Sequence, residues 1–417
     1  NFYNHNLPKV SMGNNISDKQ EKGIKRFLKD FFETEASGGI IMLLAAALAL
    51  LLANIPILSE TYLKFIKIPV EISFGEVGFV LPLKKFIKDV FMVVFFLMVG
   101  LELKREMLEG FLSKKGQKLL PALAAAGGIA LPALIFYAIV AAYPEYINGW
   151  AVPTATDIAF AIGVLAIVGK NIPAAARIFL LAIAIYDDLA AIIIVALFYG
   201  SGFSADYIVP LFGVLGILYA MNYIRIPYLT PYYVMCALLA VFLHKTGFHT
   251  TIAGVVTAMF IPMRLAPSDS KSPLGTAIHY LHPWVSYFIL PLFAFASAGI
   301  VFSDMTLDYV FAPLPLAITL ALFAGKQIGI FGLTYGSIKI GLAERPEGSS
   351  WLEIYAMSIL AGIGFTMSLF IGLLAFSDPI LQAEVKIGVI LGSLLSTIWA
   401  VIVIKYIEAQ RQKHIKG

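Results

Sequence analysis

The chain has 417 residues, of which 59% are hydrophobic and only 13% are charged. Soluble domains carry about 25% charged residues, so a chain of this composition cannot cover its apolar side chains in water. The formal net charge of +4 is too small to indicate nucleic-acid binding, and the single cysteine, Cys236, excludes a disulfide framework or a cysteine-based metal site. The composition therefore predicts an all-α protein embedded in a membrane through most of its length.

Apolar runs of helical length predict about twelve transmembrane helices. They lie near residues 38–55, 86–103, 119–142, 150–168, 176–199, 207–223, 229–243, 249–263, 281–301, 315–337, 352–376 and 387–405. Most of the 30 Lys and Arg residues lie at the chain ends and in the even-numbered connections, which places both termini in the cytoplasm. We expect a cytoplasmic segment 1–36, a membrane domain 37–406 and a cytoplasmic tail 407–417.

The first external connection departs from this charge pattern. It contains five lysines: Lys64, Lys67, Lys84, Lys85 and Lys88. In the same connection, apolar and polar residues alternate around a glycine within Pro69–Leu83, which predicts a small external β-hairpin. A lone hairpin is marginally stable in water, so a second subunit is a plausible source of a partner strand. An irregular surface loop is the alternative.

Two of the predicted helices carry residues that interrupt a helix. Pro153 lies in the fourth span, and Gly362 and Gly364 lie in the eleventh. Spans 3–5 and 10–12 form two triplets of opposite orientation, and the interrupted helix is the middle member of each. Interrupted helices at matching places in inverted repeats are typical of transporters that bind their substrate at the membrane midplane.

Two adjacent aspartates, Asp187 and Asp188, lie inside the otherwise uncharged run Ile178–Tyr199. An aspartate at the centre of a membrane helix costs about 2.5 to 3.5 kcal/mol, so such residues usually mark an ion or proton pathway. Neighbours on a helix diverge by about 100°. We therefore expect one aspartate to face a cavity and the other to face the interrupted helices or Lys326, which lies in the tenth span. A purely structural pair is the alternative.

Asp157 lies directly after Thr156, beside the break in the fourth span. An interrupted helix has unsatisfied N–H groups where its second half begins and unsatisfied C=O groups where its first half ends. Asp157 is expected to neutralise the positive ends and Lys326 the negative ones. A stabilising role without transport is the alternative for both residues.

Carboxylates combined with hydroxyl and backbone oxygens suit a hard cation. Burial and a like neighbouring charge both favour the protonated form of a carboxyl group, so the same oxygens can bind protons. Competition between a cation and protons for one site leads to their exchange across the membrane. The alternatives are a cation channel or another ion-coupled solute carrier. An intramembrane aspartyl protease using Asp157 and Asp188 is disfavoured, because the Gly-x-Gly-Asp pattern of that class is absent.

Several long strings resemble the bacterial NhaA Na⁺/H⁺ antiporter family from about Phe31 to Ile404. They are FFLMVGLELKRE, WAVPTATDIAFAIGVLA, IFLLAIAIYDDLAAIIIVALFY, HPWVSYFILPLFAFASAG and GIGFTMSLFI. The resemblance implies twelve transmembrane helices in the bacterial inner membrane, with two partly unwound helices crossing at midmembrane. It also implies electrogenic exchange of Na⁺ or Li⁺ for a larger number of H⁺, no cofactor and no enzymatic activity.

The resemblance also implies roles for individual residues. Asp187 and Asp188 correspond to the family's Na⁺ ligands and proton carriers, with Asp188 the main ligand and Asp187 the partner of Lys326. Thr156 and Asp157 correspond to the Thr-Asp of the unwound helix, and Lys326 to a lysine that compensates charge or carries a proton.

Four further residues match the family's pH-sensing region: Glu102, Glu106, His249 and His282. We expect them at the cytoplasmic mouth, and ordinary solvated or hydrogen-bonding residues are the alternative. The stretch 274–279 (LGTAIH) lacks the charged residues expected there. The chain is therefore expected to depart from the family's pH activation.

Overall fold

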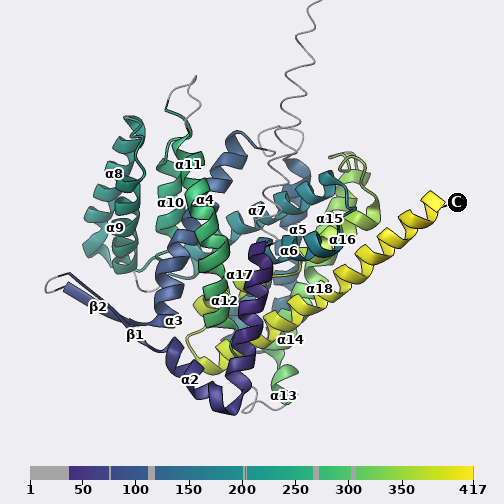
Figure 1. The fold of residues 1–417 in the computed structure, drawn as a ribbon, viewed down its shortest axis with the longest axis horizontal. Helices are drawn as coiled ribbons and strands as arrows, with labels where there is room; N and C mark the ends of the chain where they lie inside the picture. The colour runs from purple at the N-terminus through teal and green to yellow at the C-terminus, as the bar shows by residue number, and fades with distance from the viewer. Residues whose placement is uncertain are drawn as a thin grey trace, which may run out of the picture.

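The protein is built almost entirely from helices, with one small two-stranded sheet projecting from the helical body (Figure 1). The computed structural model describes residues 37–74, 77–110, 118–200, 202, 204–265, 272–301 and 307–416. The predicted N-terminal segment 1–36 lies outside the described residues. The final helix continues through the predicted tail to Lys416.

The first described helix is Ser37–Asn54. The other α-helices are α2 (Pro56–Ile66), α3 (Leu83–Phe86), α4 (Met92–Leu108), α5 (Leu119–Val140), α6 (Ile158–Val168), α7 (Ala174–Phe198), α8 (Ile208–Tyr223), α9 (Thr230–Thr246), α10 (Ile252–Phe260), α11 (Pro273–Trp284), α12 (Leu290–Ala298), α13 (Leu307–Val310), α14 (Pro313–Leu320), α15 (Lys326–Lys339), α16 (Trp351–Leu360), α17 (Phe365–Ala375) and α18 (Pro379–Lys416). Short 3₁₀ segments are η3 (Pro144–Thr154) and η4 (Ala205–Tyr207). The π-helical turns η1 (Ile87–Phe91), η5 (Val285–Ile289) and η6 (Ala321–Gly325) join α3 to α4, α11 to α12 and α14 to α15.

Among the described residues, seven helices are long and apolar enough to cross a membrane, and two bent pairs raise the number to nine. The three predicted spans not counted there correspond to α4, α9 and α10. Helices α4 and α9 have 17 residues each, at the lower limit for a span. Helix α10 has only nine, because its helical conformation ends at Phe260. The region 249–263 is therefore a short helix within the described structure.

The predicted β-hairpin is confirmed. Strands β1 (Pro69–Phe74) and β2 (Val77–Pro82) pair antiparallel, with Pro69 opposite Pro82 and Phe74 opposite Val77. The two prolines pair at the open end of the hairpin, where the chain enters and leaves the sheet. Because the sheet has only two strands, each strand has one edge without a partner among the described residues.

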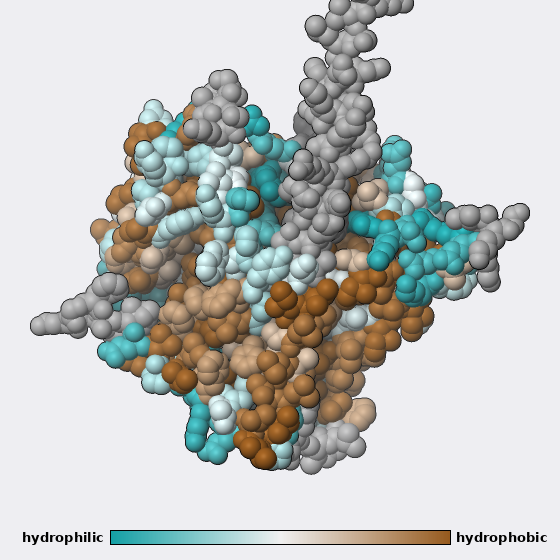
Figure 2. Space-filling view, viewed as in Figure 1, coloured by the Kyte–Doolittle hydropathy of each residue, from teal (hydrophilic) through white to brown (hydrophobic). Residues whose placement is uncertain are grey.

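Large apolar side chains remain on the outside of the helical body. On the face seen in Figure 2, apolar residues cover much of the middle, and hydrophilic residues gather mostly in the upper part and again at the lower end. Inside, one cluster of buried side chains joins the interrupted helices to α7, α14 and α18. A second cluster joins α4 to α8, α9, α10 and α11. An apolar exterior over a packed core is the arrangement expected in a lipid bilayer.

The stretch 274–279 lies in α11, where Leu274, Ala277 and Ile278 are buried in the second cluster. Charged residues at these three positions would be buried among apolar side chains. The packing of α11 therefore explains why the stretch carries apolar residues there.

Helices α5 and α15 pack closely because glycines face each other across their contact. A Cβ added at Gly127 would lie 2.2 Å from the carbonyl oxygen of Gly329, and a Cβ added at Gly329 would lie 2.2 Å from the carbonyl oxygen of Gly127. Real atoms do not approach this closely. The contact fixes the position of α15, which begins at Lys326.

We predict that Gly329→Ala lowers the melting temperature of the purified protein, because the added methyl group must push α5 and α15 apart. Gly332→Ala on the same helix is the matched control, since a Cβ there meets nothing within 4 Å. Overpacking of this kind costs about 1 to 3 kcal/mol. Equal melting temperatures for the two variants would show that the helices are not held at this distance by the glycines.

Candidate functional site

The two interrupted helices meet at their breaks. Segments η3 and α6 are bent by 47° at the first break, and α16 and α17 are bent by 42° at the second. The backbone N–H of Asp157 in the first break donates to the carbonyl oxygen of Ile363 in the second, at 2.7 Å. A Cβ added at Gly364 would lie 3.1 Å from the carbonyl oxygen of Ala155, so the small residue permits this approach. The predicted breaks at Pro153, Gly362 and Gly364 are thus confirmed.

Asp157 caps two helices at once. One carboxylate oxygen, Oδ1, accepts from the N–H of Phe160 at 3.0 Å in α6. The other, Oδ2, accepts from the N–H and the hydroxyl of Thr366 in α17, at 2.9 and 2.5 Å. Both helices begin at this carboxylate, so it neutralises their positive ends. The expectation for Asp157 is confirmed.

The group that contacts the carbonyl end of α16 is Thr156, whose hydroxyl lies 2.7 Å from the carbonyl oxygen of Ala361. Lys326 reaches this end through Thr156, because its Nζ lies 3.1 Å from Thr156 Oγ1. Neutralisation of the carbonyl ends by Lys326 stays a prediction. The hydroxyl of Thr156 also lies 2.6 Å from Asp187 Oδ2. A hydroxyl has one proton to donate, so it serves only one of these acceptors at a time.

Lys326 pairs with Asp187. Its Nζ lies 2.5 Å from Asp187 Oδ2 and 3.1 Å from Thr156 Oγ1. The exposed fraction of both charged side chains is 0%. Lys326 is held directly after the π-helical turn η6, and such turns are frequent at functional sites. The pairing expected from the sequence is therefore present, and one charge compensates the other in the core.

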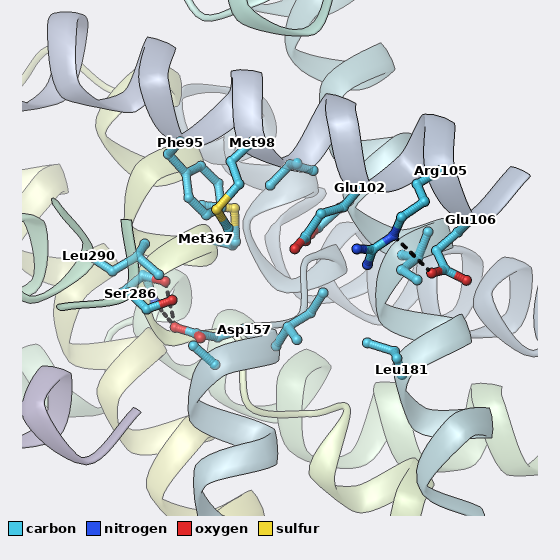
Figure 3. A pocket seen from close by; sticks show the side chains of 16 residues that line it. Phe95, Met98, Glu102, Arg105, Glu106, Asp157, Leu181, Ser286, Leu290 and Met367 are labelled. Atoms are coloured by element: carbon cyan, nitrogen blue, oxygen red, sulfur yellow. Dashed lines mark hydrogen bonds and ion pairs between the residues drawn. The ribbon is translucent and has the colours of Figure 1, made fainter. Parts of the chain in front are cut away.

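Asp188 points in a different direction from Asp187, as the helical geometry predicts. It lines a cavity of about 50 Å³ together with Asp157, Thr366 and Glu102. A volume of this size holds a few water molecules. Figure 3 shows Asp157, Glu102 and Glu106 around this cavity, with Glu102 and Glu106 projecting from α4. The cavity thus connects the breaks with the end of α4.

Asp187 Oδ1 and Asp188 Oδ1 are buried without a hydrogen-bond partner among the described residues. Asp157, Asp187 and Asp188 are at most 5% exposed, and Lys326 is their buried counter-charge. With three carboxylates and one ammonium group, this buried cluster of side chains carries a net negative charge. The arrangement can accept a cation or protons, because either one would offset unpaired buried charge.

The described residues contain no group of three or more His, Cys, Asp or Glu side chains arranged to hold a metal ion. Asp187 is engaged by Lys326, and Asp157 by helix caps. A cation at Asp188 would therefore draw its other ligands from oxygens that also serve these contacts, and from water.

The four candidate pH-sensing residues do not lie together. Glu102 and Glu106 line the cavity at the end of α4, and His282 lies in α11, which packs against α4. His249 lies elsewhere, in the turn between α9 and α10, where the neighbouring Thr250 hydroxyl donates to the backbone oxygen of Asp89 at 3.1 Å. Asp89 precedes α4, at the opposite end from Glu106. The expectation that all four share one mouth is wrong for His249.

His249 also has contacts of its own. Its Nδ1 lies 2.7 Å from the hydroxyl of Thr251, and its ring packs edge-on against Phe370. These contacts agree with an ordinary hydrogen-bonding role.

The sequence did not point to two polar residues at the cavity. Thr366 lies in the string GIGFTMSLFI, just after the second break, and its hydroxyl lies 2.5 Å from Asp157 Oδ2. Ser286 is 1% exposed and lines the cavity from η5 (Figure 3). Nothing in the local pattern distinguishes Ser286 from a packing residue. Both side chains add hydroxyl oxygens to the site.

We predict that Thr366→Val destabilises the protein by about 1.5 to 3 kcal/mol, the usual contribution of a hydrogen bond to a charged group. Valine keeps the shape but removes the hydroxyl donor to Asp157. Thr366→Ser keeps the donor and is expected to melt close to the wild type. If valine and serine variants melt alike, the hydroxyl does not hold the carboxylate.

Comparisons with known proteins agree on one family. Residues 29–404 match the family model described as Na⁺/H⁺ antiporter 1. The chain is 44% identical to Na⁺/H⁺ antiporter NhaA 2 of Pseudomonas savastanoi pv. phaseolicola, over 92% of this chain and 96% of that protein. It is 46% identical to NhaA 2 of Klebsiella pneumoniae, over 85% and 91%, and 43% identical to NhaA of Campylobacter concisus, over 94% and 95%.

Proposed function

The chain belongs to the NhaA family of Na⁺/H⁺ antiporters, and we propose that it exports Na⁺ or Li⁺ in exchange for a larger number of H⁺. The observation that carries the site assignment is the buried charge imbalance: three carboxylates face one ammonium group, and Asp188 Oδ1 has no partner among the described residues. Lys326 offsets one of the three charges and the two helix ends that Asp157 caps offset another, so a single Na⁺ or one proton balances the charge that remains. The two therefore compete for the same carboxylates.

In this mechanism Asp188 binds the cation from the cavity, with Thr156, Asp157 and water supplying further oxygens. Asp187 leaves Lys326 when Na⁺ arrives, and its carboxylate can take up a proton once Na⁺ has departed. In one half of the cycle Asp187 and Asp188 carry the cation, and in the other half they carry protons. Two protons against one Na⁺ move net charge, which makes the exchange electrogenic.

Alternating access requires that the breaks move relative to the cavity. The triplets of spans 3–5 and 10–12 are suited to move as one unit. Each contains one bent pair, and the two breaks are joined by the hydrogen bond between Asp157 and Ile363. We infer that they are inverted repeats within twelve transmembrane helices of the domain 37–406. The repeats rock about the site and expose it to one side at a time.

The positive-inside pattern supports a bacterial inner-membrane orientation with both termini in the cytoplasm and the β1–β2 hairpin outside. The open strand edges of this hairpin support pairing with the hairpin of a second copy. We therefore propose a homodimer joined through residues 69–83.

The experiment that tests the function is cation-driven collapse of a preset ΔpH in everted vesicles. Na⁺ and Li⁺ are expected to release the gradient, and choline is the control cation. Adding valinomycin with K⁺ to remove the membrane potential is expected to accelerate exchange, because charge movement otherwise opposes it. Passive cation flux without proton movement would identify a channel and contradict antiport.

For pH control, we predict that Glu102→Gln with Glu106→Gln shifts the midpoint of the activity profile, whereas His249→Ala leaves it unchanged. The glutamates line the cavity that leads to Asp188, whereas His249 lies next to Thr250, which contacts Asp89 at the opposite end of α4. The tested range is about pH 6.5 to 9. The buried apolar face of α11 also supports a shallower profile than an all-or-none switch. A midpoint that moves only with His249 would reverse this assignment.

A further inference from the structure

A second cavity, of about 660 Å³, lies away from the aspartates. The ends of α2 and α12 and the beginnings of α3 and α18 form its walls. Lys88 lines it just before α4, whereas Glu106 lines the first cavity near the end of α4. The two cavities therefore open at opposite ends of this helix. The second lies at the end that we propose to be external.

The charged groups that line this cavity are all basic. They are Lys67, Lys84, Lys85, Lys88 and Lys386, and no Asp or Glu is among the described lining residues. The Nζ of Lys386 donates to the carbonyl oxygen of Gly299 at 2.8 Å, which points the charge across the gap between α18 and α12. Lys88 lies 3.6 Å from Asp89 Oδ1. Lys84 is half-buried, and burial together with the charge of Lys88 lowers its pKa below the usual range.

These lysines are among the residues that depart from the positive-inside pattern, so membrane insertion does not account for them. Like charges around one cavity repel each other, and the repulsion is strongest where water is partly excluded. A bound anion would remove this cost. Lysine ammonium groups bind phosphate oxygens as point charges, and apolar walls such as Leu63 and Ile300 suit the glycerol and acyl parts of a lipid.

We propose that this lysine-lined cavity binds a phosphate group, either as free phosphate or as the headgroup of an anionic phospholipid. The cavity exceeds what a single small anion fills, and its lysines come from α2, α3, η1 and α18 or the residues next to them. A bound phosphate joins these elements at the external end. The proposal depends on the cavity and its lysines, and not on cation transport.

The test is thermal unfolding of the delipidated protein in detergent with sodium phosphate, with short-chain phosphatidylglycerol, or with short-chain phosphatidylcholine. Phosphatidylcholine carries no net charge and controls for general lipid effects. The test variant is Lys84→Gln with Lys85→Gln. Lys64→Gln is the matched control, because Lys64 belongs to the same connection but pairs with Glu60 on the exposed face of α2 and does not line the cavity.

We expect phosphate or phosphatidylglycerol to raise the melting temperature of the wild type and of Lys64→Gln, with at least tenfold weaker binding in the double variant. A rise with free phosphate identifies a soluble anion, and a rise with phosphatidylglycerol alone identifies a lipid headgroup. No rise with either, or equal rises in all three proteins, overturns the proposal. If the double variant does not fold, Lys386→Gln provides the same comparison. Binding is expected to persist in Asp188→Asn, which separates this site from the transport site.

Discussion

Asp188→Asn is expected to abolish Na⁺-driven collapse of ΔpH in everted vesicles while leaving the protein folded. The substitution keeps the size of the side chain but removes its charge and its ability to carry a proton. Asp188 lines the cavity and has a buried oxygen without a partner among the described residues, so nothing else at this position replaces the lost ligand. Exchange should fall to the background of vesicles without the protein.

The matched control is Asp206→Asn, the same chemical change at an exposed position in η4. It is expected to transport like the wild type. Melting temperatures of both variants, measured in detergent, establish that the protein is folded. Retained Na⁺-dependent exchange in a folded Asp188→Asn protein would remove Asp188 from the ligand role.

Lys326→Ala is expected to cause the largest loss of stability. It strands the carboxylate of Asp187, which is fully buried and 2.5 Å from the lysine in the wild type. Breaking a buried ion pair in this way costs about 3 to 5 kcal/mol. The melting temperature of the purified protein is the measurement, and Lys339→Ala, at an exposed position on the same helix, is the control.

A second substitution distinguishes the loss of the Lys326–Asp187 ion pair from the loss of packing by the lysine side chain. Adding Asp187→Asn to Lys326→Ala removes the stranded charge and should recover part of the lost stability, since residues in one ion pair couple in a double-mutant cycle. Additive effects of the two substitutions would mean that the pair does not act as a unit. A Lys326→Ala protein that melts like the wild type would contradict the burial of this lysine.

Local patterns were sufficient to predict the features that depend on short stretches of sequence. The broken helices follow from Pro153, Gly362 and Gly364, and the hairpin from alternation on either side of a turn. The divergence of Asp187 and Asp188 follows from helix geometry. These features require no knowledge of which distant helices become neighbours.

The features that the sequence did not predict depend on tertiary packing. Asp157 caps α17 through Thr366 only because two breaks more than 200 residues apart in sequence meet. Thr156 contacts the carbonyl end of α16 directly, and Lys326 reaches it through Thr156. The family motif predicts His249 and Glu102 at the same cytoplasmic mouth. The order of the predicted spans instead places His249 next to the external connection between spans seven and eight. Helix order was the better guide in that case.

The most direct test of competition between Na⁺ and H⁺ is the apparent KM for Na⁺ measured as a function of pH in proteoliposomes. If both ligands bind the carboxylates of Asp187 and Asp188, KM should rise as pH falls, because protons occupy the site first. The rise should approach tenfold per pH unit for each competing proton, since binding one ligand excludes the other. A KM for Na⁺ that stays constant across the active pH range would contradict a shared site.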